Sequence, residues 1–326
     1  MHMPPLEAET AATWIQAIQY DVGVLHPIRS LTNYGVAATT IEGLEDKGIR
    51  SFASIAGALA PAIERCVRQI AHTTRVGLTD VDTVMLVTDS HEGLFEAPGG
   101  EHTDFRSTRE RFLDFVQNIG LHRATVMTLG YGSCANVLHG LMVADALVRS
   151  GRSRCVLMIL AERYPTVDAR LRQGDSAIAA DGVAVALLCA SPGRGGLSFG
   201  IEQVNITPYD VDTAKADGGN VLLESFRAMK NAAADCYQAC QRQPGDYRWV
   251  VMGDYNLKSS LMYAKFLGFP PERVFLNNVG LRGHIPFDPL IGLADLLTAG
   301  KCAPGDHVLM YVGGPVSGGV ISLRAA

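Results

Sequence analysis

The chain has 326 residues, of which 48% are hydrophobic and 19% are charged, a composition typical of soluble globular proteins. Its formal net charge is −5, and Lys and Arg are scattered along the chain, which argues against a partner that is a nucleic acid or an anionic membrane. No run approaches the roughly 20 apolar residues of a membrane span, and the N-terminus lacks the pattern of a secretory signal. We therefore expect a cytoplasmic protein that is not bound to a membrane.

Seven cysteines, an odd number in a chain without an export signal, argue against a disulfide framework. Cys155 and Cys189 lie in strand-like apolar runs, and we expect both to be small core residues. Cys236 and Cys240 could face one another across a helical turn. No further Cys or His pair lies near them in sequence, so we expect no metal site.

Strand-like and helical patterns alternate along the chain. The predicted helices cover residues 54–73, 108–119, 135–150, 221–243, 258–267 and 288–299. The predicted strands cover residues 81–90, 123–129, 153–162, 181–191, 196–209, 247–254, 272–280, 306–314 and 318–325, with the strands at 181–191 and 196–209 expected to be adjacent. This alternation predicts an α/β protein with mainly parallel sheets covered by helices on both faces. The order helix 54–73, strand 81–90 returns as helix 221–243, strand 247–254, which predicts two duplicated halves, residues 1–195 and 196–326.

Cys134 stands between a short apolar segment and a long helical pattern, directly after Gly-Tyr-Gly-Ser. A thiol at a helix N-terminus is close to the positive end of the helix dipole and to backbone N–H groups without intrahelical partners. Both favour the thiolate, which is the reactive form. A small buried residue at a strand–helix junction would give the same local pattern, so Cys134 alone leaves packing and nucleophilic roles open.

The segment "LGYGSCANVLHGLMVADALVRSGRSRCVLMILAERY" resembles the nucleophile segment of thiolase-fold enzymes, and most of all that of ketoacyl-ACP synthase III. "GDSAIAADGVAVALLCAS" resembles a strand pair of that family. "NLKSSLMYAKFLGFPPERVFLNNVGLRGH" and "LLTAGKCAPGDHVLMYVGGPVSGGVISL" resemble its C-terminal half. The resemblance extends from about residue 125 to the end of the sequence. It implies the internally duplicated, five-layered αβαβα thiolase fold, and usually a homodimer.

The same resemblance implies a site. The family's histidine opens a His-x-x-Asn-Leu motif whose counterpart is "MGDYNL", where Gly253 or Asp254 holds the histidine's place. The family's His-Gly-Asn loop corresponds to "LRGHIPFDP", with His284 at the place of the asparagine. The interval from Asp254 to His284, 284 − 254 = 30 residues, equals the family's interval between its two groups. The resemblance therefore implies a site formed by Cys134, His284 and Asp254.

This departure from the family bears on the reaction. Decarboxylative condensation creates an enolate, which needs neutral or cationic hydrogen-bond donors, and an aspartate at one of their places would oppose that step. A carboxylate beside an imidazole instead fixes its tautomer and stabilises its protonated form, which would suit His284 to deprotonate a hydroxyl or amine. Thiolase-type reversal needs a second cysteine in the final Gly-rich loop, and "YVGGPVSGG" has none. We therefore predict an acyltransferase that works through a Cys134 acyl-enzyme, as some members of the family do in secondary metabolism.

Further groups are implied for substrate binding. We expect the oxyanion hole to consist of the backbone N–H of Cys134 and that of Gly313 or Gly314, because glycine allows a carbonyl to approach closely. Asn256 either orients its loop or donates a hydrogen bond to pantetheine, and Lys258 matches a basic position that meets the acidic carrier protein. The expected donor is a thioester of acyl carrier protein or CoA, and the expected acceptor is a small molecule. No further cofactor is expected.

Two other hypotheses stay open: a ketoacyl-ACP synthase III-type condensing enzyme, and a non-catalytic subunit that partners an active homologue. Without the resemblance, His284 would be interpreted as a loop histidine and Asp254 as a turn residue. The acyl group and the acceptor depend on pocket walls drawn partly from residues 85–120, where the resemblance is weakest.

Overall fold

The computed structural model describes residues 12–74, 76–96, 105–171, 177–193, 196–209 and 218–326. Nine of its strands form one sheet in the order β5-β4-β6-β7-β1-β8-β11-β10-β9. Their bounds are β1 Thr13–Asp21, β4 Thr83–Val87, β5 Thr125–Leu129, β6 Cys155–Glu162, β7 Gly182–Cys189, β8 Phe199–Pro208, β9 Trp249–Val251, β10 His307–Gly313 and β11 Ser317–Ala325. A separate pair consists of β2 Val24–Pro27 and β3 Ser51–Ser54.

The sheet is mixed, so the prediction of mainly parallel sheets was wrong. Only the pairs β4–β5, β4–β6 and β9–β10 are parallel, while the other five pairings in this sheet are antiparallel. The prediction that strands 181–191 and 196–209 are adjacent was wrong as well. The N-terminal strand β1 lies between β7 and β8 and pairs with both.

The strand order on one side of the β1–β8 pair is repeated on the other side of that pair. On one side β4 runs parallel to β6, which is followed by the antiparallel strands β7 and β1. On the other side β9 runs parallel to β10, which is followed by the antiparallel strands β11 and β8. Each side therefore contains the same four-strand unit. The predicted boundary between the halves, between residues 195 and 196, adjoins residues 194–195, which lie outside the described residues.

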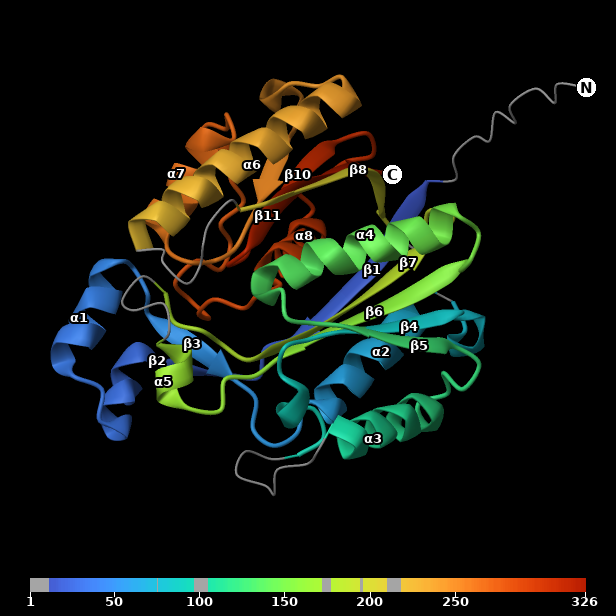
Figure 1. Cartoon of the computed structure of the whole chain (residues 1–326), viewed down its shortest axis with the longest axis horizontal. Helices are drawn as coiled ribbons and strands as arrows, with labels where there is room; N and C mark the ends of the chain where they lie inside the picture. The colour runs from blue at the N-terminus through green and yellow to red at the C-terminus, as the bar shows by residue number, and fades with distance from the viewer. Residues whose placement is uncertain (1–11, 75, 97–104, 172–176, 194–195, 210–217) are drawn as a thin grey trace, which may run out of the picture.

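The helices form three layers around the two parts of the sheet (Figure 1). α4 and α8 lie in the middle and pack with β6, β7, β10 and β11 in one core. α2 and α3 cover the outer face beside β4 and β6, and α6 and α7 cover the outer face beside β9 and β10. The five-layered αβαβα architecture predicted from the sequence is therefore confirmed. The helix bounds are α1 Ala38–Asp46, α2 Ala60–Thr74, α3 Phe105–Asn118, α4 Asn136–Arg149, α5 Val167–Arg170, α6 Gly218–Cys240, α7 Leu257–Phe266 and α8 Asp288–Thr298.

Strand β6 explains why the central strands are almost entirely apolar. Successive side chains of a strand point to opposite faces, and helices cover both faces here. Val156, Met158 and Leu160 accordingly pack into the middle core, and Leu157 and Ile159 pack into the outer one.

Two further sequence predictions need correction. Cys155 and Cys189 lie opposite each other in the β6–β7 register and form a disulfide, so they are more than small core residues. Residues 272–280 do not form a strand, because a 3₁₀ turn occupies Pro271–Arg273 and Val274 makes only an isolated bridge with Val250. Within the described part of the chain, no helix has the length and apolar character needed to cross a bilayer.

Candidate active site

Cys134 lies in a tight turn between β5 and α4, within the 3₁₀ segment Ser133–Ala135. Tyr131 and Ser133 have φ values of 66° and 50°, in the left-handed region that costs free energy for residues other than glycine. Asp89 holds this turn. Its carboxylate accepts the N–H groups of Tyr131 and Ser133, the latter at 2.8 Å, and the side-chain amide of Asn136 at 2.9 Å. These bonds compensate the strain and fix the cysteine at the start of the helix.

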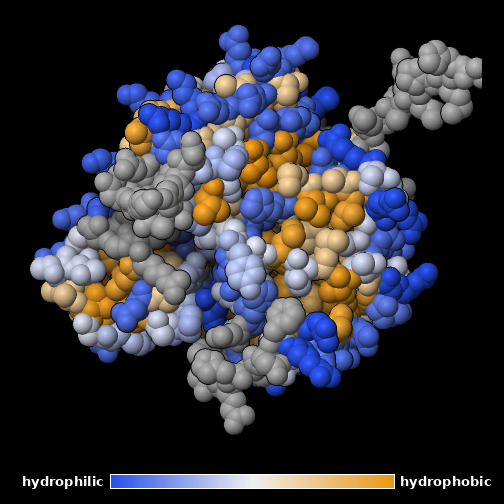
Figure 2. All heavy atoms as spheres, in the orientation of Figure 1, coloured by the Kyte–Doolittle hydropathy of each residue, from blue (hydrophilic) through white to orange (hydrophobic). Residues whose placement is uncertain are grey.

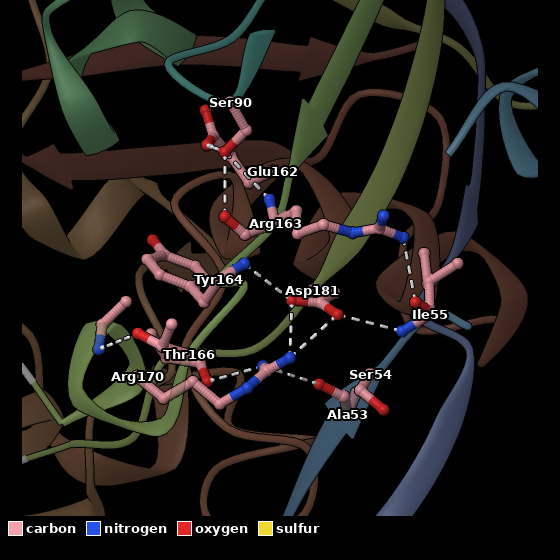
Figure 3. A network of polar contacts seen from close by, with 12 residues as sticks. Ala53, Ser54, Ile55, Ser90, Glu162, Arg163, Tyr164, Thr166, Arg170 and Asp181 are labelled. Carbon is pink, nitrogen blue, oxygen red and sulfur yellow. Dashed lines mark hydrogen bonds and ion pairs between the residues drawn. The ribbon is translucent and has the colours of Figure 1, made fainter. Parts of the chain in front are cut away.

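Glu162, the last residue of β6, holds the segment of Asp89 and Ser90 in place through hydrogen bonds. Its carboxylate accepts the N–H of Asp89 at 2.8 Å and the hydroxyl of Ser90 at 2.6 Å, and Figure 3 shows the contact with Ser90. Burial raises the pKa of Glu162 to about 7, although the two hydrogen bonds oppose this shift. A buried carboxyl group is thus part of the support for the nucleophile turn.

The segment after β6 is fixed by a second carboxylate, Asp181 (Figure 3). Asp181 forms an ion pair with Arg170 at 2.9 Å and accepts the N–H groups of Tyr164 and Ile55 at 2.9 Å and 3.0 Å. These contacts tie the end of β6 to the end of β3 and to α5. Tyr164 belongs to the surroundings of the thiol, because burial and nearby negative charges, including that of Cys134, raise its pKa.

The structure brings Cys134 and His284 together across 150 residues of sequence. Sγ of Cys134 lies 3.3 Å from Nε2 of His284, and both side chains are buried. His284 is held by its backbone, since its N–H donates to Ile178 at 2.7 Å and its carbonyl accepts from Ala180 at 2.9 Å. A nucleophile and an imidazole base at this separation can exchange a proton.

The carboxylate that contacts the imidazole is Asp288, so the prediction that Asp254 does so was wrong. Oδ2 of Asp288 lies 2.8 Å from Nδ1 of His284. The same oxygen accepts the N–H groups of Ile285 and Asp254, each at 3.0 Å. Asp288 is the first residue of α8 and is followed by Pro289. The sequence "HIPFDP" contains this carboxylate four residues after the histidine, but the family interval predicts Asp254 instead.

Asp254 instead forms a buried ion pair with Arg282, at 2.9 Å. Arg282 also lies 3.6 Å from Asp288 and 3.7 Å from Asp295. Burial and the negative charge of Asp288 raise the pKa of Asp254 to about 7, although Arg282 opposes the shift. Asp254 therefore acts on His284 through its charge and through its backbone N–H on Asp288, while its carboxylate is paired with Arg282.

The charge on His284 depends on its two neighbours. Burial lowers its pKa, but the charge of Cys134 and the hydrogen bonds with Asp288 and Cys134 outweigh burial and raise the pKa to about 10. A charge on the sulfur therefore favours the protonated imidazole. An imidazolium next to a thiolate is an arrangement found in enzymes with a cysteine nucleophile.

Tyr255 is a residue of the site that the sequence analysis did not single out. Its ring lies over that of His284, with centroids 4.2 Å apart. Its hydroxyl donates to the carbonyl of Gly313 at 3.2 Å and lies 4.0 Å from Sγ of Cys134. The neighbouring Gly253 makes this placement possible, because a Cβ there would stand 2.8 Å from Cε2 of Tyr255.

The two glycines proposed for the oxyanion hole differ. The N–H of Gly314 donates to Ser317 at 2.8 Å, so Gly314 is not supported as an oxyanion donor. Its role is close packing, since a Cβ would lie 2.8 Å from Cβ of Ala135 in the nucleophile turn. Gly313 lies opposite Gly318 in the β10–β11 pairing, one position before Gly314. Because hydrogen-bonded and non-hydrogen-bonded pairs alternate along an antiparallel ladder, the N–H and the carbonyl of Gly313 point away from β11. Gly313 therefore stays a prediction.

Asn256 and Lys258 lie at the start of α7. The side chain of Asn256 accepts the N–H of Ser259 at 2.9 Å as the N-cap, which supports the hypothesis that it orients its loop. Lys258 is exposed on the first turn of the same helix. Among the described residues no group of three or more His, Cys, Asp or Glu side chains could hold a metal ion.

Comparison with known proteins agrees with this architecture. The family model described as 3-oxoacyl-[acyl-carrier-protein (ACP)] synthase III matches residues 131–203. The chain is 29% identical over 299 residues to beta-ketoacyl-[acyl-carrier-protein] synthase III of Granulibacter bethesdensis, covering 82% of this chain and 86% of that one. It is 26% identical over 205 residues to a synthase III of Streptomyces coelicolor, covering 60% and 62% of the two chains.

Solved structures show the same fold at lower sequence identity. ChlB3, titled an acyltransferase, has a TM-score of 0.75 at 18% identity over 96% of this chain and 97% of its own. FabH of Pseudomonas aeruginosa has a TM-score of 0.73 at 16% identity over 96% and 98%. A variant of OleA from Xanthomonas campestris has a TM-score of 0.75 at 12% identity over 96% and 98%. The chain is thus similar in sequence to ketoacyl-ACP synthase III proteins and has the fold of their solved structures.

Proposed function

We propose that the protein is an acyltransferase that moves an acyl group from a thioester, through an acyl-enzyme at Cys134, to a hydroxyl or amine. The observation that carries the proposal is the chain of contacts Cys134–His284–Asp288, with distances of 3.3 Å and 2.8 Å. It gives a sulfur nucleophile an imidazole partner whose other nitrogen is fixed by a carboxylate, the arrangement used for acyl transfer on unrelated folds.

In the first half-reaction, the thiolate of Cys134 attacks the thioester carbonyl. A C–S bond to Cys134 forms, and the C–S bond to the donor breaks with its electron pair on the leaving thiolate. His284, protonated at neutral pH because its pKa is raised to about 10, gives its Nε2 proton to that thiolate. The backbone N–H groups of Cys134 and Gly313 are the proposed oxyanion donors.

In the second half-reaction, neutral His284 accepts a proton from the acceptor hydroxyl or amine. Acylation prepares His284 for this step, because loss of the charge of the sulfur lowers the pKa of His284 and favours the neutral imidazole that can act as a base. The acceptor then forms its bond to the carbonyl carbon, and the bond to Cys134 breaks with its electron pair on the sulfur. The imidazolium–thiolate pair is thereby restored.

The donor in this proposal is a thioester of acyl carrier protein or CoA, and the acceptor is a small molecule of secondary metabolism. Exposed Lys258 on α7 supports an acidic carrier protein, whose charge is complementary.

We also propose a homodimer. Support comes from β5, an edge strand of the sheet with partly exposed residues, and from Tyr131 next to it, which is 92% exposed. Figure 2 shows hydrophobic residues gathered over nearby α4, where Met142 is 44% exposed.

Decarboxylative condensation is the second candidate reaction, and two observations support it. Asp254 is paired with Arg282, so it does not present a free negative charge to an enolate. The hydroxyl of Tyr255 and the imidazolium of His284 both lie at the sulfur and could serve as donors. Against condensation stands Asp288, which strengthens the imidazole as a base and suits it to a heteroatom acceptor.

The test is intact-mass spectrometry of the protein after exposure to a panel of acyl thioesters, followed by addition of alcohols or amines. We expect an adduct on Cys134 that a heteroatom acceptor discharges, and no adduct in Cys134→Ala. Release of CO2 and formation of a C–C bond with a malonyl thioester would identify a condensing enzyme instead. Absence of any adduct, while an added homologous partner becomes loaded, would identify a non-catalytic subunit.

A further inference from the structure

Tyr255 lies beside both reacting side chains of the proposed site. Its hydroxyl oxygen is 4.0 Å from Sγ of Cys134, and its ring packs on His284. The ring occupies space that a side chain at residue 253 would need, since a Cβ there would come within 2.8 Å of it. The space left by Gly253 therefore allows Tyr255 to place its phenol in the site. The motif histidine of the family is missing from this part of the sequence.

The phenol can donate a hydrogen bond but does not ionise at neutral pH. Burial, followed by the negative charge of Cys134, raises its pKa well above the ordinary value of 10. In the structure the hydroxyl is bonded to the carbonyl of Gly313 at 3.2 Å, a neutral acceptor. A charged sulfur is a stronger acceptor than a neutral carbonyl, so rotation of the O–H toward Sγ is favoured when negative charge develops there.

We propose that Tyr255 is a catalytic residue that donates a hydrogen bond to the sulfur of Cys134 when that sulfur leaves the acyl group. This inference rests on the proposed function. During transfer, Nε2 of His284 accepts the proton of the acceptor and cannot at the same time donate to the sulfur. The bond from the acyl carbon to Sγ breaks with its electron pair on the sulfur, and the phenol stabilises that charge. The proton stays on Tyr255.

The experiment compares Tyr255→Phe with Tyr237→Phe, each of which loses one hydroxyl. Tyr237 is the matched control, because its hydroxyl donates to the carbonyl of Leu267 at 2.8 Å. We expect Tyr255→Phe to slow discharge of the Cys134 acyl-enzyme by about 10- to 100-fold, the range for one hydrogen bond to a charged group. Tyr237→Phe should discharge at the wild-type rate. Equal rates of discharge in Tyr255→Phe and the wild type would overturn the proposal.

A second readout does not depend on acyl transfer. Alkylation of Cys134 by iodoacetamide as a function of pH reports how well the site stabilises the thiolate. We expect Tyr255→Phe to move the midpoint of this profile to higher pH, and Tyr237→Phe to leave it unchanged. If no thioester loads the wild type, the proposed function fails, and a shifted midpoint would still support the contact with the sulfur. An unshifted midpoint would count against Tyr255 in either case.

Discussion

Nδ1 of His284 lies 2.8 Å from Oδ2 of Asp288, four residues further along the chain at the first position of α8. Both side chains are almost fully buried. Because Oδ2 also accepts two backbone N–H groups, the carboxylate cannot rotate away from the imidazole without leaving these donors unpaired. The relationship therefore fixes both the tautomer and the direction of the ring that faces Cys134.

Replacing Asp288 by Asn should reduce acyl transfer far more than replacing Asp254 by Asn. Asp288→Asn removes the charge that stabilises the imidazolium, and we expect a loss of about 100- to 10,000-fold in kcat/KM. Asp254 contacts Arg282 and not the imidazole, so we expect less than about a tenfold loss in Asp254→Asn. The measurement is kcat/KM for transfer from one thioester donor to one acceptor, compared between the two variants and the wild type. A larger loss in Asp254→Asn would restore Asp254 as the partner of His284.

Blocking the sulfur should lower the pKa of His284 from its value of about 10. Both the charge of Cys134 and its hydrogen bond raise that pKa, and a neutral thioether formed with iodoacetamide removes them. Asp288 remains, so part of the upward shift should persist. The measurement is a titration of the ring resonances by NMR, assigned with His284→Gln. His307, whose pKa is lowered by burial and which pairs with Glu202, is the internal control and should not change.

Glu162 should make the protein less stable as the pH rises toward neutrality. Its pKa is about 7 in the folded protein, above the ordinary 4.5. Between these values the folded state binds more protons than the unfolded state, so the free energy of unfolding falls as pH increases. We expect Glu162→Gln to reduce this decrease in unfolding free energy by on the order of 2 kcal/mol between pH 4.5 and 7. The measurement is urea unfolding across that pH range. Asp254, whose pKa is raised to about 7, acts in the same direction, so some slope should remain. A variant slope equal to that of the wild type would contradict this role.

Asp89 should control the reactivity of Cys134 as well as stability. Asp89→Ala leaves the N–H groups of Tyr131 and Ser133 without their acceptor, which we expect to cost about 2 to 4 kcal/mol of unfolding free energy and most of the Cys134 acylation. Asp82→Ala is the matched control. Asp82 lies at the other end of β4 and accepts the N–H groups of Arg154 and Cys155 at 2.6 Å and 3.3 Å. We expect it to lower stability but to leave acylation of the folded protein intact, and equal losses of acylation would contradict the assignment.

Helices on both faces of the sheet could be predicted from the alternating helical and strand patterns, whereas the five layers were implied by the resemblance to the family. The helix after Cys134 and the strand that became β6 each have a periodic pattern that needs no tertiary information. The position of β1 could not be predicted, because its pairing with Cys189 and Ile201 depends on residues far away in sequence. The parallel or antiparallel direction of each strand depends on the same distant pairings.

The cysteine and the histidine of the site could be predicted from the sequence. The carboxylate that contacts the histidine could not, because two aspartates lie near it. Cys134 and His284 could be predicted from their motifs, and the structure places them 3.3 Å apart. Asp254 and Asp288 are both buried near His284, and only their geometry decides which contacts the ring. Tyr255 was missed because a tyrosine in a loop has no pattern of its own, and its placement depends on the space that Gly253 leaves free.

The position of β1 also has a consequence for how the protein is made. Translation produces this strand before the strands that it pairs with, and Trp14 finds its partner Cys189 only after 189 − 14 = 175 further residues have been added. Its contact with β8 waits longer still, since Thr13 pairs with Ile201. Such distant pairings slow folding. We therefore expect a nascent chain on the ribosome to hold β1 unpaired until most of the first half has emerged, a period in which chaperones have access to it.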